Sequence, residues 1–179
     1  MWLTNFVTPT LKQTLEMLGG LLDRARRQMP ERADALMSGR LTADMFPLAS
    51  QLRLVAFHAQ ESIFKIRGES SPEWLDALSI EAHDAVESPG TMEDAQTRID
   101  EALWFLEDNV HQVAGNARSK ISLQIPEAGV IDLSGEQYFR DFVLPQFYFH
   151  SVTAYAILLT QGVNIGKLDF IPQIFAYVR

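Results

Sequence analysis

The chain contains no cysteine among its 179 residues. This absence excludes disulfides, thiolate nucleophiles and cysteine-bound metal centres, and it fits a protein of the reducing cytosol. Basic residues are also few, because 15 Lys and Arg stand against 23 Asp and Glu and leave a formal charge of −8. Nucleic acids and anionic membrane surfaces require basic patches. We therefore expect neither as a partner.

A secretory leader and a long apolar run are missing too. The N-terminal sequence MWLTNFVTPTLKQ lacks the basic start and the apolar block of a signal peptide. The most apolar stretch, around 155–159, is interrupted by Thr153, Thr160 and Gln161, and is too short and polar to cross a bilayer. These features predict a cytoplasmic protein. The HExxH, P-loop, GxGxxG and GxSxG motifs are absent as well, so no local signature names a reaction.

The composition that remains is that of a globular domain, with 47% apolar and 21% charged residues. Apolar residues recur at helical spacing in four long segments. The predicted helices cover residues 8–27, 47–66, 92–115 and 134–162. Thr8 and Pro9 suggest a capping hydroxyl followed by proline at the first helical position, and Pro145 should bend the last helix. Thr91, with Asp94 three residues later, resembles a capping signature for the third helix.

Three other segments complete the expected architecture. Residues 69–90 form an excursion with a short helix over 73–85, and the alternation of Ile121, Leu123 and Ile125 predicts a hairpin before the last helix. The tail, 163–179, is apolar enough to dock on the body. We predict a single domain over 1–179, an all-α four-helix bundle with a small β-hairpin.

His150 is the most conspicuous candidate for chemistry, because it lies in a helix that is apolar on every side. Gln146 and Thr153 lie about one turn before and after it. One face of this helix should meet the bundle, and the other should meet the tail or a second subunit. The alternative for His150 is a packed core histidine bonded to a carbonyl or carboxylate group.

His58 is a second candidate, because it precedes Glu61 by three residues, the spacing at which a carboxylate and an imidazole can share a metal. A helical wheel puts it away from the centre of the apolar stripe of its helix. It is therefore interpreted as a solvated pair with Glu61. His83 and His111 are expected at the surface.

Two blocks of sequence carry a resemblance to known proteins: RLTADMFPLASQL and LPQFYFHSVTAYAILLTQGVNIGKLDF. They resemble the DMFPL and LPxFYFHxxTAYAIL blocks of an uncharacterised bacterial family in the DinB/YfiT-like metalloenzyme superfamily. The resemblance spans residues 8–170. It implies an up-down-down-up four-helix bundle that is frequently dimeric, so a homodimer is expected.

The superfamily's metal-binding members hold a divalent metal with three histidines, one on the second helix and an HxxxH pair on the last. His150 matches the second histidine of that pair, and Gln146 stands where its partner would be. The position on the second helix falls on Gln51 or on the Phe57–His58 region. An amide oxygen is a weak donor for zinc or nickel. The resemblance therefore implies a degenerate metal site, with His150 and His58 as its remaining ligands, and we expect no resident cofactor.

Three functions remain open. The first is binding of a small polar ligand in a cleft around His150, with Gln146, Thr153 and Gln51 as contacts. The second is catalysis by a metal-dependent hydrolase or thiol-dependent transferase, in which His150 is a ligand or general base. The third is a structural dimer in which His150 is only packed.

Overall fold

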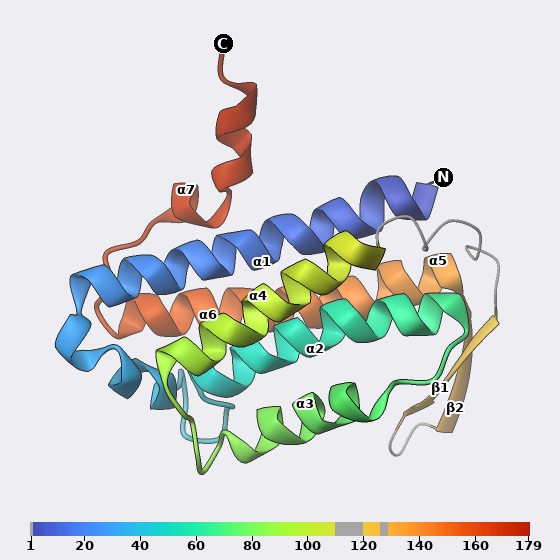
Figure 1. Cartoon of the computed structure of the whole chain (residues 1–179), viewed down its shortest axis with the longest axis horizontal. Coiled ribbons are helices and arrows are strands. Elements are labelled where there is room, and N and C mark those ends of the chain that lie inside the picture. Colours follow the sequence, from blue (N-terminus) through green and yellow to red (C-terminus); the bar gives the residue numbers. More distant parts are fainter. Residues whose placement is uncertain (1, 110–119, 126–128) are drawn as a thin grey trace.

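A computed structural model describes residues 2–109, 120–125 and 129–179, and it confirms the all-α bundle with a small hairpin. Three of the four long helices are α1 (Trp2–Gln28), α2 (Leu48–Arg67) and α4 (Met92–Asn109), and the fourth ends in α6 (Leu144–Thr160). Figure 1 shows them side by side. α2 is central, because it packs against α4, α6 and the short helix α3 (Glu73–Asp84).

The sequence sets the limits of α2 clearly. Pro47 precedes the helix with extended backbone, and Gly68 ends it in the left-handed region at φ 74°. The predicted apolar stripe is buried in full, from Leu48 to Ile66. Because neighbours cover the other sides too, polar side chains such as Gln51 and Gln60 are also buried. The polar side chains of Gln51 and Gln60 therefore lie in the interior, on different sides of α2.

The connections between the helices follow the predicted pattern. Thr91 and Asp94 cap the start of α4 through reciprocal hydrogen bonds. The strands β1 (Lys120–Ile125) and β2 (Gly129–Ser134) pair antiparallel, with Lys120 opposite Ser134 and Ile125 opposite Gly129. The predicted end of the third helix near residue 115 and most of the hairpin turn lie outside the described residues.

The last long helix is irregular just before Pro145. It consists of α5 (Gly135–Gln137), a π-helical segment (Tyr138–Val143) and α6. In the π segment the Leu144 N–H donates to the Phe139 carbonyl, five residues back. Pro145 has no N–H to continue a regular ladder, so the wide turn takes up the mismatch just before it.

The predicted start of the first helix at Thr8 and Pro9 is wrong. α1 begins at Trp2, and Pro9 lies inside it. The fixed φ of proline is helical, so Pro9 removes one hydrogen bond without ending the helix. Burial of Val7 and Leu11 on the same face supports the continuation.

The predicted docking of 163–179 needs a correction. Val163 and Ile165 are buried, and Arg24 pairs with Asp169 of α7 (Lys167–Phe170). Beyond α7, however, residues 172–179 are exposed and project from the bundle in Figure 1. Ile174, Phe175, Tyr177 and Val178 remain about half exposed or more.

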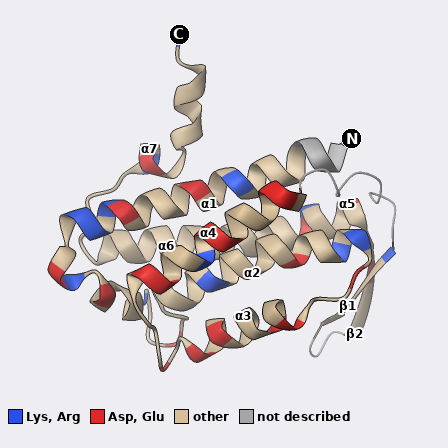
Figure 2. Cartoon of the chain, in the orientation of Figure 1, with Lys and Arg blue, Asp and Glu red and all other residues tan. Residues whose placement is uncertain are grey.

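The distribution of charge and apolar surface bears on the choice of partners. Figure 2 shows basic residues scattered over the helices rather than gathered on one face. The helical segment Gly135–Thr160 has the length and composition of a membrane span, with a mean hydropathy of 1.3 in its most apolar window. This corrects the expectation that the most apolar stretch is too short and polar to cross a bilayer, because the stretch extends well beyond 155–159. A core helix passes the same test, and 44% of that window is buried inside the protein.

The start of this last helix supplies a test of local stability. The Ser134 hydroxyl accepts from the Gln137 N–H, and the Gln137 side chain accepts from the Ser134 N–H. Replacing Ser134 with alanine should lower the free energy of unfolding by about 1 kcal/mol, measured by urea denaturation. Ser122→Ala, in the exposed hairpin, is the control and should cost less. Equal losses in the two variants would contradict a role for the cap.

Candidate functional site

His150 projects from α6 into the interface with α2 and is only 7% exposed. Its Nδ1 lies 2.7 Å from Oε1 of Gln51. The Gln51 Nε2 donates to the Phe46 carbonyl at 3.1 Å, and a carbonyl can only accept. The Gln51 oxygen must therefore face His150 and accept from its Nδ1–H. This network fixes the tautomer and leaves the lone pair of His150 on Nε2.

The same surroundings keep the imidazole neutral. Burial, and to a smaller extent the nearby His58, lower the pKa of His150 to about 4. A general base works best when its pKa lies near the working pH. At neutral pH, His150 is therefore better suited to accept a hydrogen bond than to remove a proton.

His58 lies beside His150, which corrects its assignment to a solvated edge of the second helix. The two ring centroids are 5.5 Å apart, with 15° between the planes. The His58 Nδ1 is 3.8 Å from Oε2 of Glu61, and both side chains are mostly buried. The helical wheel failed because α2 packs against α6 as well as α3 and α4, so the edge of its apolar stripe is covered.

The other predicted contacts are distributed differently. The Thr153 hydroxyl donates to the Phe149 carbonyl at 2.7 Å, within its own helix. Gln146 is half-buried one turn before His150 and, among the described residues, forms no hydrogen bond with it. Gln51, and not Gln146, is thus the amide that orients the imidazole.

Tyr138 is a buried neighbour that the sequence did not reveal. Burial raises the pKa of its phenol, and the negative charge of Glu61 raises it further. Glu61 therefore acts on both His58 and Tyr138. The π segment begins at Tyr138 and changes the helical periodicity between Tyr138 and His150.

The residues present do not fit a three-histidine metal centre. Within residues 2–109, 120–125 and 129–179, no group of three His, Asp or Glu side chains could hold a metal ion. His58 and His150 supply two imidazoles, and the residue one turn before His150 is Gln146, which carries an amide and not a third imidazole. No step of chemistry is therefore assigned to a metal here.

The comparisons with known proteins agree with this architecture. Residues 3–171 match a family described as a domain of unknown function, DUF1993. The chain belongs to the DUF1993 family. The fold of this DUF1993 protein is similar to a crystal structure of a DinB family member from Shewanella denitrificans, with a TM-score of 0.73. The two are 24% identical, and the match covers 95% of this chain and 92% of the other. No curated protein matches the chain in sequence.

In this DUF1993 protein the two sequence blocks that carried the resemblance meet at the site. Phe46 and Gln51 belong to the first block, and His150 belongs to the second. The hydrogen bonds from His150 to Gln51 and from Gln51 to Phe46 join them. The site is thus built where the start of α2 faces the middle of α6.

Proposed function

We propose that this protein binds a small polar ligand, one with an N–H or O–H donor, at Nε2 of His150 and without a resident metal. The observation that carries the proposal is the hydrogen bond between the His150 Nδ1–H and Gln51. It orients a neutral imidazole and makes its other nitrogen an acceptor. His58 and Gln146 are partly exposed and would line the approach.

Two features favour binding over catalysis. The low pKa of His150 makes it a weak general base at neutral pH. Among the described residues, no group of three His, Asp or Glu side chains could hold a metal ion. This removes support for a metal-dependent hydrolase. Nothing in the described site favours a thiol-dependent transferase.

The proposal is tested by NMR titration of the histidine rings, which is practical because the chain has only four histidines. The probes are acetamide, N-methylacetamide and N,N-dimethylacetamide, which carry two, one and no N–H donors. Acetamide and N-methylacetamide should shift the Nε2 signal of His150 saturably, and the dimethyl compound should not. Equal responses to all three, or no response, would contradict the proposal.

Metal content separates this proposal from the enzyme alternative. The protein is purified without a chelator or histidine tag, and zinc and nickel are measured in the wild type and in His150→Ala. We expect less than stoichiometric metal in both. Stoichiometric metal that disappears in the variant would favour the metalloenzyme instead.

We also propose that the outer face of α6 joins two copies of the chain. Phe149, Val152 and Leu159 on this face are about half exposed, an unusual amount of apolar surface for one helix. Tyr155 on the same helix packs against Phe170 of α7, with the ring centroids 5.4 Å apart. The tail therefore covers only part of the outer face of α6. Sedimentation at micromolar concentration should show a dimer, and Val152→Glu should shift it to monomer. A monomeric wild type would refute the interface.

A further inference from the structure

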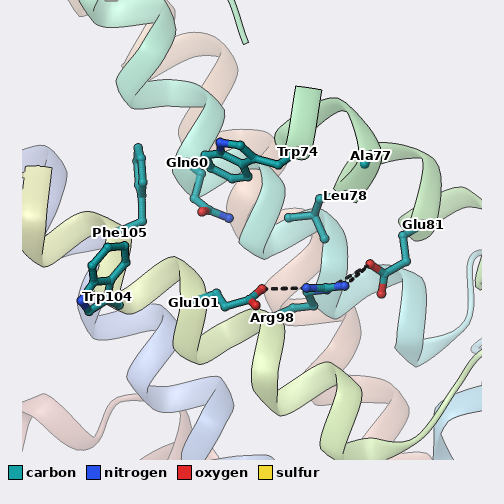
Figure 3. A pocket seen from close by; sticks show the side chains of 9 residues that line it. All are labelled: Gln60, Trp74, Ala77, Leu78, Glu81, Arg98, Glu101, Trp104 and Phe105. Carbon is teal, nitrogen blue, oxygen red and sulfur yellow. Dashed lines mark hydrogen bonds and ion pairs between the residues drawn. The ribbon is translucent and has the colours of Figure 1, made fainter. Parts of the chain in front are cut away.

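A cavity lies between α2, α3 and α4, and His150 is not among the residues that line it. Its volume is about 480 Å³, within the range of sites for small organic ligands. Figure 3 shows Trp74 and Gln60 on one side, Trp104 and Phe105 at one end, and a chain of charged groups along another side. The remaining lining includes Leu78, and the cavity shares no lining residue with the His150 site.

Two tryptophans give this cavity aromatic walls. Trp74 of α3 is 48% exposed and Trp104 of α4 is 68% exposed. Trp74 is held in place by edge contacts with Phe64 and Phe105, at centroid distances of 6.0 and 5.9 Å. Exposed tryptophans around a hollow are costly in water unless a ligand covers them. Their ring faces attract cations more strongly than those of any other side chain.

The charged groups of the cavity hold each other in place. Arg98 donates to Glu81 through Nε at 3.0 Å and to Glu101 through Nη1 at 2.8 Å. Glu81 also accepts from Arg53, which lies behind it and is nearly fully buried. Asp94 acts on both arginines. Three carboxylates thus face two guanidinium groups, so the positive charge of Arg98 is more than offset.

Gln60 places an unused acceptor inside the cavity. It is only 3% exposed, and its Nε2 donates to the Ala56 carbonyl at 3.0 Å. That bond assigns the amide orientation and leaves Oε1 as an acceptor with no hydrogen bond from the described residues. The second oxygen of Glu101 also has no partner among them. A ligand that bonds to both oxygens must therefore supply hydrogen-bond donors.

We propose that this cavity binds a small organic amine in its protonated form. The ammonium group donates to Gln60 Oε1 and Glu101, and lies against the tryptophan faces. The apolar body of the ligand packs against Trp74, Leu78 and Phe105. Aromatic walls, unused acceptors and an excess of carboxylates together favour a cation over an anion or a neutral molecule.

Tryptophan fluorescence tests this proposal directly, because two of the three tryptophans line the cavity. The full chain is titrated with 2-phenylethylamine, 2-phenylethanol and 3-phenylpropanoate, which share an aromatic body and differ in charge. The amine should change the fluorescence saturably and bind at least about tenfold more tightly than the other two. Equal or tighter binding of the carboxylate or alcohol, or no saturable change with any probe, would overturn the proposal.

Variants then assign the contacts. Gln60→Leu and Glu101→Gln should each weaken amine binding by about tenfold and leave alcohol binding unchanged. Glu93→Gln is the control, since Glu93 is exposed on the same helix and does not line the cavity. Trp104→Leu changes an exposed side chain and should weaken amine binding without lowering the melting temperature. Wild-type affinity in both Gln60→Leu and Trp104→Leu would contradict the site.

Discussion

Acidification from neutral pH to about pH 4 is expected to lower the free energy of unfolding by about 3 kcal/mol through His150 alone. The reason is the difference between the two states of the chain. In the folded protein, burial and the neighbouring His58 hold the pKa of His150 at about 4, whereas the ordinary value is 6.5. Protonation of His150 in the folded protein therefore places a positive charge in a buried site that favours the neutral imidazole.

The direction of the effect follows from proton binding. Between about pH 6.5 and pH 4 the unfolded imidazole binds a proton and the folded one does not, so the unfolded state gains stability as the pH falls. The contribution of His150 is fully present above the unfolded pKa and is lost as the pH approaches the folded one. Urea denaturation at several pH values in this window measures it.

His150→Phe is the matched control for this prediction. Its absolute stability will differ, because Gln51 loses a hydrogen-bond partner. Its loss of stability between neutral pH and about pH 4 should nevertheless be smaller than the wild-type loss by about 3 kcal/mol. A variant with the wild-type slope would show that His150 is not the responsible group.

Replacing Glu81 with leucine is expected to cost about 3 kcal/mol of stability, measured by urea denaturation near neutral pH. Glu81 is the carboxylate that meets Arg53 at 2.7 Å, and the Arg53 side chain is only 4% exposed. Its removal leaves a buried guanidinium whose remaining hydrogen-bond partner, within the part of the chain that the structure describes, is the Ala49 carbonyl. The partial exposure of Glu81 keeps the expected loss at the lower end for buried ion pairs.

Glu101→Gln is the control for the ion pair, because the partner of Glu101 among the described residues is the more exposed Arg98. Its cost should stay below about 1 kcal/mol and diminish in high salt. Similar losses in Glu81→Leu and Glu101→Gln would contradict the special position of Arg53. Burial opposes ionisation of Glu81, but hydrogen bonds from both arginines prevail and lower the pKa of its carboxyl. Its contribution is therefore lost at lower pH than that of His150.

The long helices could be predicted because each depends on local periodicity. The buried stripe of α2 and the capping pair Thr91–Asp94 were both visible in the sequence. The start of α1 was not, because a proline with helical φ resembles both a first-turn residue and an interior one. The exposed end of the tail was also missed, since apolar composition does not say which surface covers it.

The site was harder to predict, because its decisive contacts join different helices. Spacing along α6 pointed to Gln146 as the neighbour of His150, and only the family resemblance suggested Gln51. The amide that accepts the hydrogen bond from His150 is that of Gln51, 99 residues away. The prediction that His58 is solvated was wrong for a related reason. A helical wheel gives a helix one apolar side, whereas α2 packs against neighbours on several sides. Trp74 and Trp104 carried no signal in sequence, because nothing in it places α3 and α4 around a shared hollow.

The π-helical segment Tyr138–Val143 also separates two requirements on the last helix. Its start is fixed by Ser134 at the hairpin, and its middle is fixed by the bond between His150 and Gln51. A wide turn contains one residue more than an ordinary one over the same arc. The loss of a single residue from this segment can therefore restore a regular helix without rotating the imidazole.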